Sequence, residues 1–213
     1  WEIALKAVIQ DGSAFQYADA SLQKDEKFVI AAVSRNGWAL KYVHAEFKKK
    51  REIVLSAVST DGLALSFADI KYTEDREVVS TAVTQNGWAL EYADYELRKD
   101  EEIVLTAVAQ DGMALKYAHE KLKKTKEIVL SAVNHPSWVL GYIDVAFRDD
   151  RDIVLAAVKK DGSTLLFASE QLKKDREIVL TAVTNNGWAL QYANKFFRKD
   201  WEIVLTAVYQ YSD

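Results

Sequence analysis

The sequence has no cysteine, and this absence removes several kinds of chemistry at once. Without thiols there are no disulfides, no thiolate metal sites and no cysteine nucleophile. Long apolar runs are also missing, because uninterrupted stretches such as Phe28–Val33 fall far short of the ~20 residues that span a bilayer. We therefore expect no membrane insertion.

An excess of positive charge is absent too. The 28 Lys and Arg residues are outnumbered by 32 Asp and Glu residues, which gives a formal net charge of −4. The chain as a whole therefore has no electrostatic attraction to phosphate backbones or anionic lipid. With 49% apolar and 28% charged residues, its composition is that of an ordinary folded protein.

What the sequence does contain is a repeat of 25 residues. An Ala-Val pair recurs nine times at this interval without an insertion, from Ala7 to Val208. Eight copies of a second pattern, Leu-x-Tyr or a close variant, alternate with it, from Phe15-x-Tyr17 to Leu190-x-Tyr192. A fixed period of this length indicates a solenoid of stacked units. Trp38, Trp88, Trp138 and Trp188 occupy one position in every second copy, which indicates a longer period of 50 residues.

The repeat from Asp175 to Lys199 illustrates the two helices expected in each unit. Asp175 is predicted to cap helix A, which runs to about Thr184. The turn Asn185-Asn186-Gly187 then ends helix A, with its glycine in the left-handed conformation. Helix B is predicted from Trp188 to about Arg198. The turn reads Asp-Gly or Asn-Gly in the other repeats, except for His135-Pro136-Ser137.

The width of the apolar face distinguishes a solenoid from a simple bundle. Apolar residues cover about 200° of both helices, whereas a surface helix needs only about 100°. Each helix must therefore be covered by more than one neighbour. We predict an all-α solenoid of about eight and a half two-helix repeats, with nine helices A and eight helices B. We expect a single helical-repeat domain over residues 1–213, processed or cut from a longer chain at its N-terminus, because Trp1 already falls in the first turn of a helix.

The segment DREIVLTAVTNNGWALQYA at residues 175–193 resembles a family of tandem helical repeats of unknown function. The resemblance extends over essentially the whole chain. It implies the helical-repeat fold. It implies no activity, because the family brings no catalytic residues and no agreed ligand.

Columns that hardly vary between repeats are interpreted as core. These are the Ala-Val pair, the Leu column and the Tyr or Phe column two residues later. Ser80 stands in another column that otherwise holds leucine or isoleucine, where leucine should be favoured by roughly 2 kcal/mol. The four tryptophans are expected to pack between repeats, with a ladder that stacks a ligand as the alternative.

A polar column of helix B contains the residue types of catalytic and metal sites. Its members are Asp19, His44, Asp69, Asp94, His119, Asp144, Ser169 and Asn194. Equivalent residues in successive repeats should lie ~8–10 Å apart, while metal ligands converge at ~2 Å from one ion. We therefore predict no catalytic residue, no metal ligand and no cofactor, and expect that the chain is not an enzyme.

Basic residues recur at the end of helix B, as a track along a nucleic-acid backbone would require. They are Lys48, Lys49, Arg98, Lys99, Lys123, Lys124, Arg148, Lys173, Lys174, Arg198 and Lys199. An acidic column follows within four residues, so the two charges should largely cancel beyond a Debye length of ~8 Å. A modular nucleic-acid-binding solenoid is thus the alternative function, and nucleic acid is the weaker candidate partner.

Apolar residues in variable columns are the candidate partner-binding residues. Ile70, Tyr95 and Val145 occupy a column that holds Glu or Lys in later repeats, and Leu166 replaces the Lys or Glu of others. Phe196, Trp201 and Tyr209 gather where the repeat pattern decays at Tyr211-Ser212. We expect Trp201 and Tyr209 to be covered, by folding back or by another chain, because end repeats normally present a polar outer face.

These observations favour a protein-binding repeat scaffold. We expect it to be a structural or linker component of a larger assembly, with one or more protein partners in a multisubunit complex.

Overall fold

The computed structural model describes residues 1–135 and 138–210, and all the regular structure in this part of the chain is helical. Nine α-helices A recur at the predicted positions, which confirms the all-α repeat fold. They are α1 (Glu2–Gln10), α3 (Glu26–Val33), α5 (Arg51–Val58), α6 (Arg76–Gln85), α7 (Glu101–Gln110), α8 (Lys126–Val133), α9 (Arg151–Lys160), α10 (Arg176–Asn185) and α11 (Trp201–Tyr209). The altered turn at Pro136 and Ser137 and the decayed end at Tyr211 and Ser212 lie outside the described residues.

The eight B segments are present, but each is divided into two short helices instead of forming the single helix predicted. The first is a 3-10 helix: η1 (Gly12–Tyr17), η2 (Gly37–Tyr42), η3 (Gly62–Phe67), η5 (Gly87–Tyr92), η7 (Gly112–Tyr117), η9 (Trp138–Gly141), η11 (Gly162–Phe167) and η13 (Gly187–Gln191). The second is α2 (Ala20–Gln23), α4 (Ala45–Lys48), η4 (Ile70–Tyr72), η6 (Leu97–Lys99), η8 (Leu122–Lys124), η10 (Val145–Asp149), η12 (Leu172–Lys174) or η14 (Lys195–Lys199).

The division follows from two successive extended residues in the middle of the B segment, the second of which belongs to the polar column. Val43 is an example: its φ of −70° and ψ of 144° leave the helical region, and its N–H closes the 3-10 helix onto Leu40. The next position is the polar column, whose side chains begin a new helix. Asp69, for instance, accepts a hydrogen bond from the N–H of Lys71. Asp and Asn favour such caps over a helix interior, so the run of helix-forming residues is interrupted.

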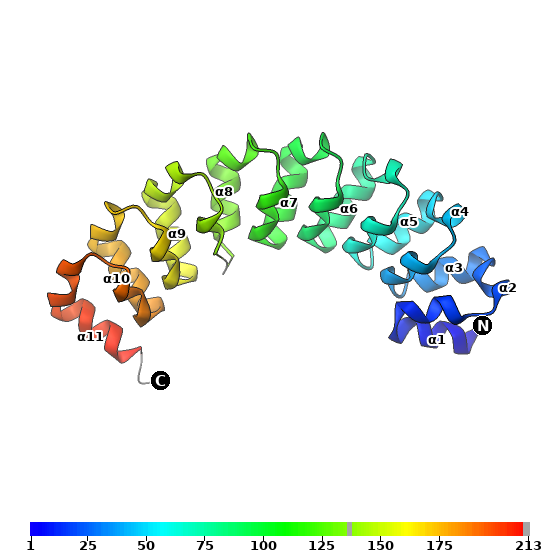
Figure 1. Ribbon diagram of the computed structural model, residues 1–213, viewed down its shortest axis with the longest axis horizontal. Coiled ribbons are helices and arrows are strands. Elements are labelled where there is room, and N and C mark those ends of the chain that lie inside the picture. Colours follow the sequence, from blue (N-terminus) through cyan, green and yellow to red (C-terminus); the bar gives the residue numbers. More distant parts are fainter. Residues whose placement is uncertain (136–137, 211–213) are drawn as a thin grey trace. The chain divides into compact units, whose positions relative to one another are not determined.

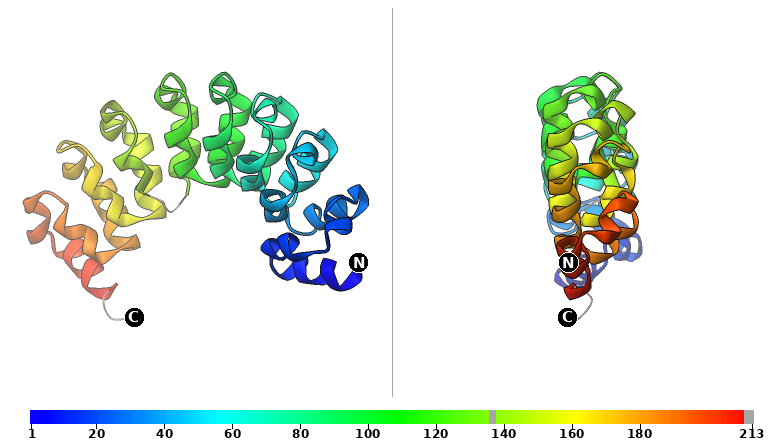
Figure 2. Two further views of the ribbon diagram at one scale, coloured as in Figure 1. Left: turned by 45° about the vertical axis from the view of Figure 1, so that its right-hand side comes forward. Right: turned by 90° about the vertical axis from the view of Figure 1, so that its left-hand side faces the viewer.

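The described chain divides into two compact units, Trp1–His119 and Glu120–Asp213. Within each unit, helices A of successive repeats pack side by side in one layer, and the 3-10 helices of the B segments pack side by side in a second layer (Figures 1 and 2). The second short helix of a repeat packs on the helix A that follows it, as α2 does on α3. Each repeat therefore shares its core with its neighbours.

The Ala-Val pair and the Leu column form that core, as predicted. Ala57, Val58 and Leu65 are all at most 1% exposed, and the same columns are buried through the interior of both units. The Tyr or Phe column is not core, and this prediction was wrong. Tyr17 and Tyr142 are 81% and 66% exposed, and the other members are half-buried or partly exposed. The aromatic residue lies at or near the end of the 3-10 helix.

The glycine of each turn is required by close approach between repeats, and not by the left-handed conformation predicted for it. Among the described residues no glycine has a positive φ. A Cβ on Gly37 would lie 2.6 Å from the carbonyl oxygen of Ala57 and 2.9 Å from Cβ of Asp61, both in the next repeat. Gly62 meets Ala82, and Gly187 meets Ala207, in the same way. In five turns the glycine thus lets the turn rest on the end of the next helix A.

We predict that Gly37→Ala lowers the free energy of unfolding by about 2–3 kcal/mol, because its methyl group would meet fixed backbone and force two repeats apart. Gly141→Ala is the matched comparison, since its Cβ would face the ring of Phe167 at 3.2 Å, a side chain that can move. Urea unfolding of both variants measures the difference. Equal stability of Gly37→Ala and the unmodified protein would contradict the close approach.

Ser80 also differs from the sequence-based expectation. Its column is half-buried in the repeats on either side of it, so Ser80 does not occupy a fully buried core position. We therefore predict that Ser80→Leu stabilises the protein by roughly 1 kcal/mol, about half the gain expected for complete burial. Thermal unfolding checks this value, and a lower melting temperature would show that leucine does not fit the site.

Candidate functional site

Six of the eight members of the polar column cap a short helix, while His44 makes no side-chain cap bond and His119 contacts Tyr95 of the repeat before it. Asp19, Asp69, Asp94, Asp144 and Asn194 each accept a hydrogen bond from a backbone N–H two residues later, at the start of the second short helix. Ser169 accepts one from Leu172 through its hydroxyl. The enrichment in Asp, Asn and Ser was the signal of this role in the sequence, because these are the preferred capping residues.

The same column also joins successive repeats through its backbone. The N–H of Asp69 donates to the carbonyl of Lys48 at 3.3 Å, and that of His119 donates to Arg98 at 3.0 Å. Ser169 and Asn194 make the equivalent bonds to Arg148 and Lys173. Five residues of the column thus each belong to a separate junction, and no group of three metal-ligating side chains occurs among the described residues.

Basic residues at the end of the B segment fold back onto the chain. Arg98 donates to the carbonyls of Ala93 and Glu91 at 2.7 Å each, and Lys48 donates to Lys41 at 2.8 Å. Burial lowers the pKa of Lys48. Lys99 and Lys173 form ion pairs with acids three residues earlier. Lys48 and Arg98 thus close carbonyl groups at the end of the 3-10 helix, whereas Lys99 and Lys173 are paired with nearby acids.

A ladder of ion pairs links the first turns of neighbouring helices A. Arg51 lies 2.9 Å from Asp75 and 2.5 Å from Glu77, both in the next repeat. The same pattern recurs for Arg76 with Asp100 and Glu102, Lys126 with Asp150 and Asp152, Arg151 with Asp175 and Glu177, and Arg176 with Asp200 and Glu202. The acids that cap one helix A therefore also bind the repeat before it.

One junction has the ladder with its charges exchanged. Glu26 stands in the column where five other helices A have Arg or Lys, and Lys50 stands where most have an Asp cap. The two side chains form an ion pair of 2.7 Å. The exchange keeps the attraction between repeats while giving up the cap, since Lys50 makes no side-chain cap bond. The ion pair between neighbouring repeats is thus retained even where the cap of helix A is lost.

Aromatic side chains that are exposed or half-buried recur on the 3-10 helices of the first unit. We define the aromatic row as Tyr17, Trp38, Tyr42, Phe67, Trp88, Tyr92 and Tyr117. Its members are exposed or half-buried, with 81% of Tyr17, 44% of Trp38 and 37% of Tyr92 accessible. The second unit carries Tyr142, Phe167 and Tyr192 in the same column, whereas the side chain of Trp138 lies outside the described part.

Tryptophans connect one repeat to the next within the aromatic row. The rings of Trp38 and Phe67 are 5.1 Å apart, and those of Trp88 and Tyr117 are 5.8 Å apart with their edges towards each other. The predicted packing between repeats is therefore present, but on a partly exposed surface. Lys116 lies 4.8 Å from the Trp88 ring centre and 4.5 Å from that of Tyr117, a cation–π arrangement.

The predicted partner-binding residues of the B segment are exposed. Ile70, Val145 and Leu166 are 78%, 72% and 38% accessible. Tyr95 is engaged within the first unit: its hydroxyl lies 2.9 Å from the imidazole Nε2 of His119, and the Lys99 ammonium is 4.2 Å from its ring centre. The column that holds Ile70 has alanine in the first two repeats.

The three candidates near the end of the chain are exposed as well. Phe196, Trp201 and Tyr209 are 70%, 76% and 66% accessible. Trp201 and Tyr209 were expected to be covered, and folding back of the chain onto the last repeat, one of the two ways proposed, does not occur in the described residues. Trp1 in the same column packs edge-on against Phe28 of the following repeat, at 5.6 Å between rings.

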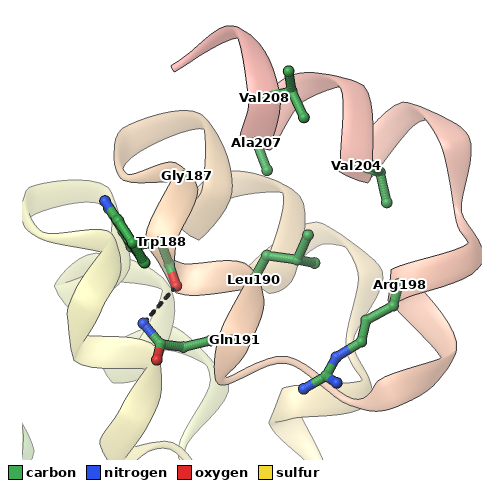
Figure 3. Close-up of a pocket in the computed structure, with 8 residues that line it drawn as sticks. All are labelled: Gly187, Trp188, Leu190, Gln191, Arg198, Val204, Ala207 and Val208. Carbon is green, nitrogen blue, oxygen red and sulfur yellow. Dashed lines mark hydrogen bonds between the residues drawn. The ribbon is translucent and has the colours of Figure 1, made fainter. Parts of the chain in front are cut away.

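A pocket of about 430 Å³ lies beside α11. It is lined by Leu190 of η13 and by Val204, Ala207 and Val208 of α11, and Gln191 beside it donates to the carbonyl of Trp188 at 3.2 Å (Figure 3). The equivalent of Val208 one repeat earlier, Val183, is completely buried, whereas Val208 is 54% exposed. This surface therefore corresponds to the face on which repeats stack.

The architecture defines a tandem helical-repeat protein, with no helix in the described ranges long and apolar enough to cross a membrane. A family model described as a domain of unknown function (DUF4116) matches residues 1–48, 50–98, 100–148, 129–173, 150–196 and 175–213, and the chain belongs to this family. Matches that begin at residues 1, 50, 100 and 150 each span two repeats, in agreement with the longer period. Comparison with curated proteins and with solved structures found no match.

We predict that the ion-pair ladder makes stability sensitive to acid. Hydrogen bonding from the guanidinium of Arg51 lowers the pKa of Asp75. Burial acts to raise the pKa of Asp100, but bonds from Arg76 and from helix N–H groups outweigh it and leave the pKa lowered. A carboxyl with a lowered folded pKa stabilises the fold above its unfolded pKa of ~3.9, and this contribution is lost as the pH falls through the folded pKa.

The measurement compares unfolding free energies at pH 7 and pH 3 for the unmodified protein and Arg76→Gln. The variant should be less stable at pH 7 and should lose less stability on acidification. Lys6→Gln, which removes only an exposed pair with Glu2 inside one helix, serves as the control and should change neither value appreciably. An unchanged pH dependence in Arg76→Gln would show that the ladder does not hold repeats together.

Proposed function

We propose that this chain is a protein-binding repeat scaffold, a structural or linker component of a larger assembly, and not an enzyme. The observation that carries the proposal is the aromatic row, which places exposed or half-buried aromatic side chains in every repeat of the first unit. Aromatic residues are enriched in protein interfaces, where charged residues are depleted. They are also frequent among the few residues that contribute most of the binding energy.

The assignment of the polar side chains supports this choice. The Asp, Asn and Ser residues that suggested catalysis cap short helices, and the bases that suggested phosphate binding donate to carbonyls and acids. What remains for a partner is an extended apolar surface without a cluster of reactive groups. Such a surface favours recognition of another protein over chemistry on a small substrate.

The test uses the full chain as bait in extract from its native source and quantifies the proteins retained. We predict that Trp38→Ala combined with Tyr42→Ala loses most of the proteins retained by the unmodified chain, while the fold measured by circular dichroism is unchanged. Ile70→Ser is the matched control, because it removes an exposed apolar residue from the second short helix of a neighbouring repeat. Retention that depends on Ile70 and not on Trp38 would place the interface on the column predicted from sequence and would contradict the aromatic row.

A further inference from the structure

We propose that the aromatic row of the first unit binds an extended, proline-rich peptide segment in the polyproline II conformation. This inference rests on the proposed function and names the kind of partner that the row fits. It is carried by the hydrogen-bond donors of the row, by the spacing expected between repeats and by the charge along the row.

The exposed side chains of the aromatic row include hydrogen-bond donors. In the described part of the chain, the indole N–H of Trp38 and the hydroxyls of Tyr17, Tyr42 and Tyr92 have no hydrogen-bond partner. Trp88 differs, because its indole N–H donates to Asp111 at 2.6 Å. An indole N–H can only donate, and a tyrosine hydroxyl donates readily. A ligand for this surface should therefore be rich in free acceptors.

A polyproline II segment has that chemistry. It makes no internal hydrogen bonds, so its carbonyl groups are available to a receptor. Proline also contributes no backbone N–H, so a proline-rich segment needs no acceptors from the surface that binds it. An α-helix or a paired strand would present carbonyls that are already bonded, and would leave the donors of Trp38 and Tyr42 unmatched.

The spacing expected between repeats also fits this ligand. One member of the Tyr or Phe column occurs per repeat, and packed helices are about 8–10 Å apart. A polyproline II helix repeats every three residues with a rise of ~3.1 Å per residue, which is about 9.3 Å per turn. The pitch of an α-helix, ~5.4 Å, and the two-residue repeat of a strand, ~6.7 Å, do not match. One proline ring per turn can thus contact one aromatic ring per repeat.

The paired rings give such a ligand a continuous aromatic surface to lie on. Trp38 lies against Phe67 of the next repeat at 5.1 Å with an angle of 57° between the ring planes, so the two rings are inclined to one another and do not stack flat. Lys41 lies near both Tyr42 and Phe67, at 5.7 and 5.8 Å from the ring centres. Proline-rich segments bind characteristically to surfaces lined by aromatic rings.

Charge distinguishes this ligand from single-stranded nucleic acid, which also stacks on aromatic rings. Lys41 and Lys116 lie along the row, but Glu91 stands between them in the same column and the carboxylate of Asp111 lies against Trp88. Acids at these positions repel a continuous phosphate backbone. A neutral peptide, or one with an isolated acid near Lys41, meets no such repulsion.

The experiment uses a blocked peptide of ten prolines as the probe and follows the tryptophan indole N–H signals of the full chain by NMR. We expect a saturable shift of the Trp38 signal. Trp88, whose N–H is already bonded, should respond less. Tyr42→Phe, which removes one hydroxyl, should weaken binding roughly two- to tenfold, the usual effect of one hydrogen bond. Trp38→Phe keeps a ring and removes the N–H donor, and should weaken binding to a similar degree.

Ile70→Ser should leave the affinity unchanged, and a Gly-Ser peptide of the same length should not bind. The inference is overturned if the proline peptide produces no saturable shift at Trp38, or if Tyr42→Phe and Trp38→Phe, both folded by circular dichroism, bind it as tightly as the unmodified chain. A shift produced by an oligothymidine but not by the proline peptide also overturns it. If the proline peptide fails while Trp38→Ala with Tyr42→Ala still loses a protein partner, the proposed function stands and only the identity of the ligand is wrong.

Discussion

The close approach between the turn of one repeat and helix A of the next is the constraint on which the rest of the array depends. At Gly37 there is no room for even a methyl group beside the carbonyl oxygen of Ala57. This contact fixes how far apart two repeats lie, and it repeats at Gly62, Gly87 and Gly162. With that spacing set, Arg51 reaches Asp75, the backbone of Asp69 reaches Lys48, and Trp38 reaches Phe67. The contacts that hold the array are thus made almost entirely between neighbours, as in other repeat proteins.

Much of the fold can be predicted from the sequence because the repeats align without gaps. The Ala-Val pair, the Asp caps of helix A and the Asp-Gly or Asn-Gly turns mark nine helices and their order. The division of the B segment was missed because its apolar residues also satisfy a helical pattern over residues 188–198. The deciding signal was the capping residue in the middle, such as Asn194, which was interpreted only as a polar column. The glycine was predicted correctly in the turn, but for its ability to adopt the left-handed conformation. The structure shows instead that it is needed because the turn lies against the next repeat.

The candidate site was harder to predict, for a physical reason. In a solenoid a column that never changes can be buried between repeats or exposed along one face, and sequence alone does not separate the two. The Tyr or Phe column is as regular as the Leu column two residues before it, yet Leu65 is 1% exposed and Tyr17 is 81% exposed. The polar column, in contrast, recurs because the second short helix of most repeats needs a cap, and the acids at the start of helix A recur because they cap that helix and pair with the repeat before it. Asp75 fills both needs at once, as a cap of α6 and a partner of Arg51.

The central claim is that the 3-10 helices have no stability of their own and are held by the repeats on either side. Short helices are marginal in isolation, and 3-10 hydrogen bonds have poorer geometry than those of an α-helix. Site-resolved native-state hydrogen exchange tests this directly at the amides of Ala39 and Ala64, which close 3-10 turns onto Asn36 and Asp61. The account predicts opening free energies within ~1 kcal/mol of those in the middle of α5, because neighbouring repeats must separate before either amide is exposed. Exchange of Ala39 and Ala64 by local fluctuations, with opening free energies near zero while α5 stays protected, would contradict it.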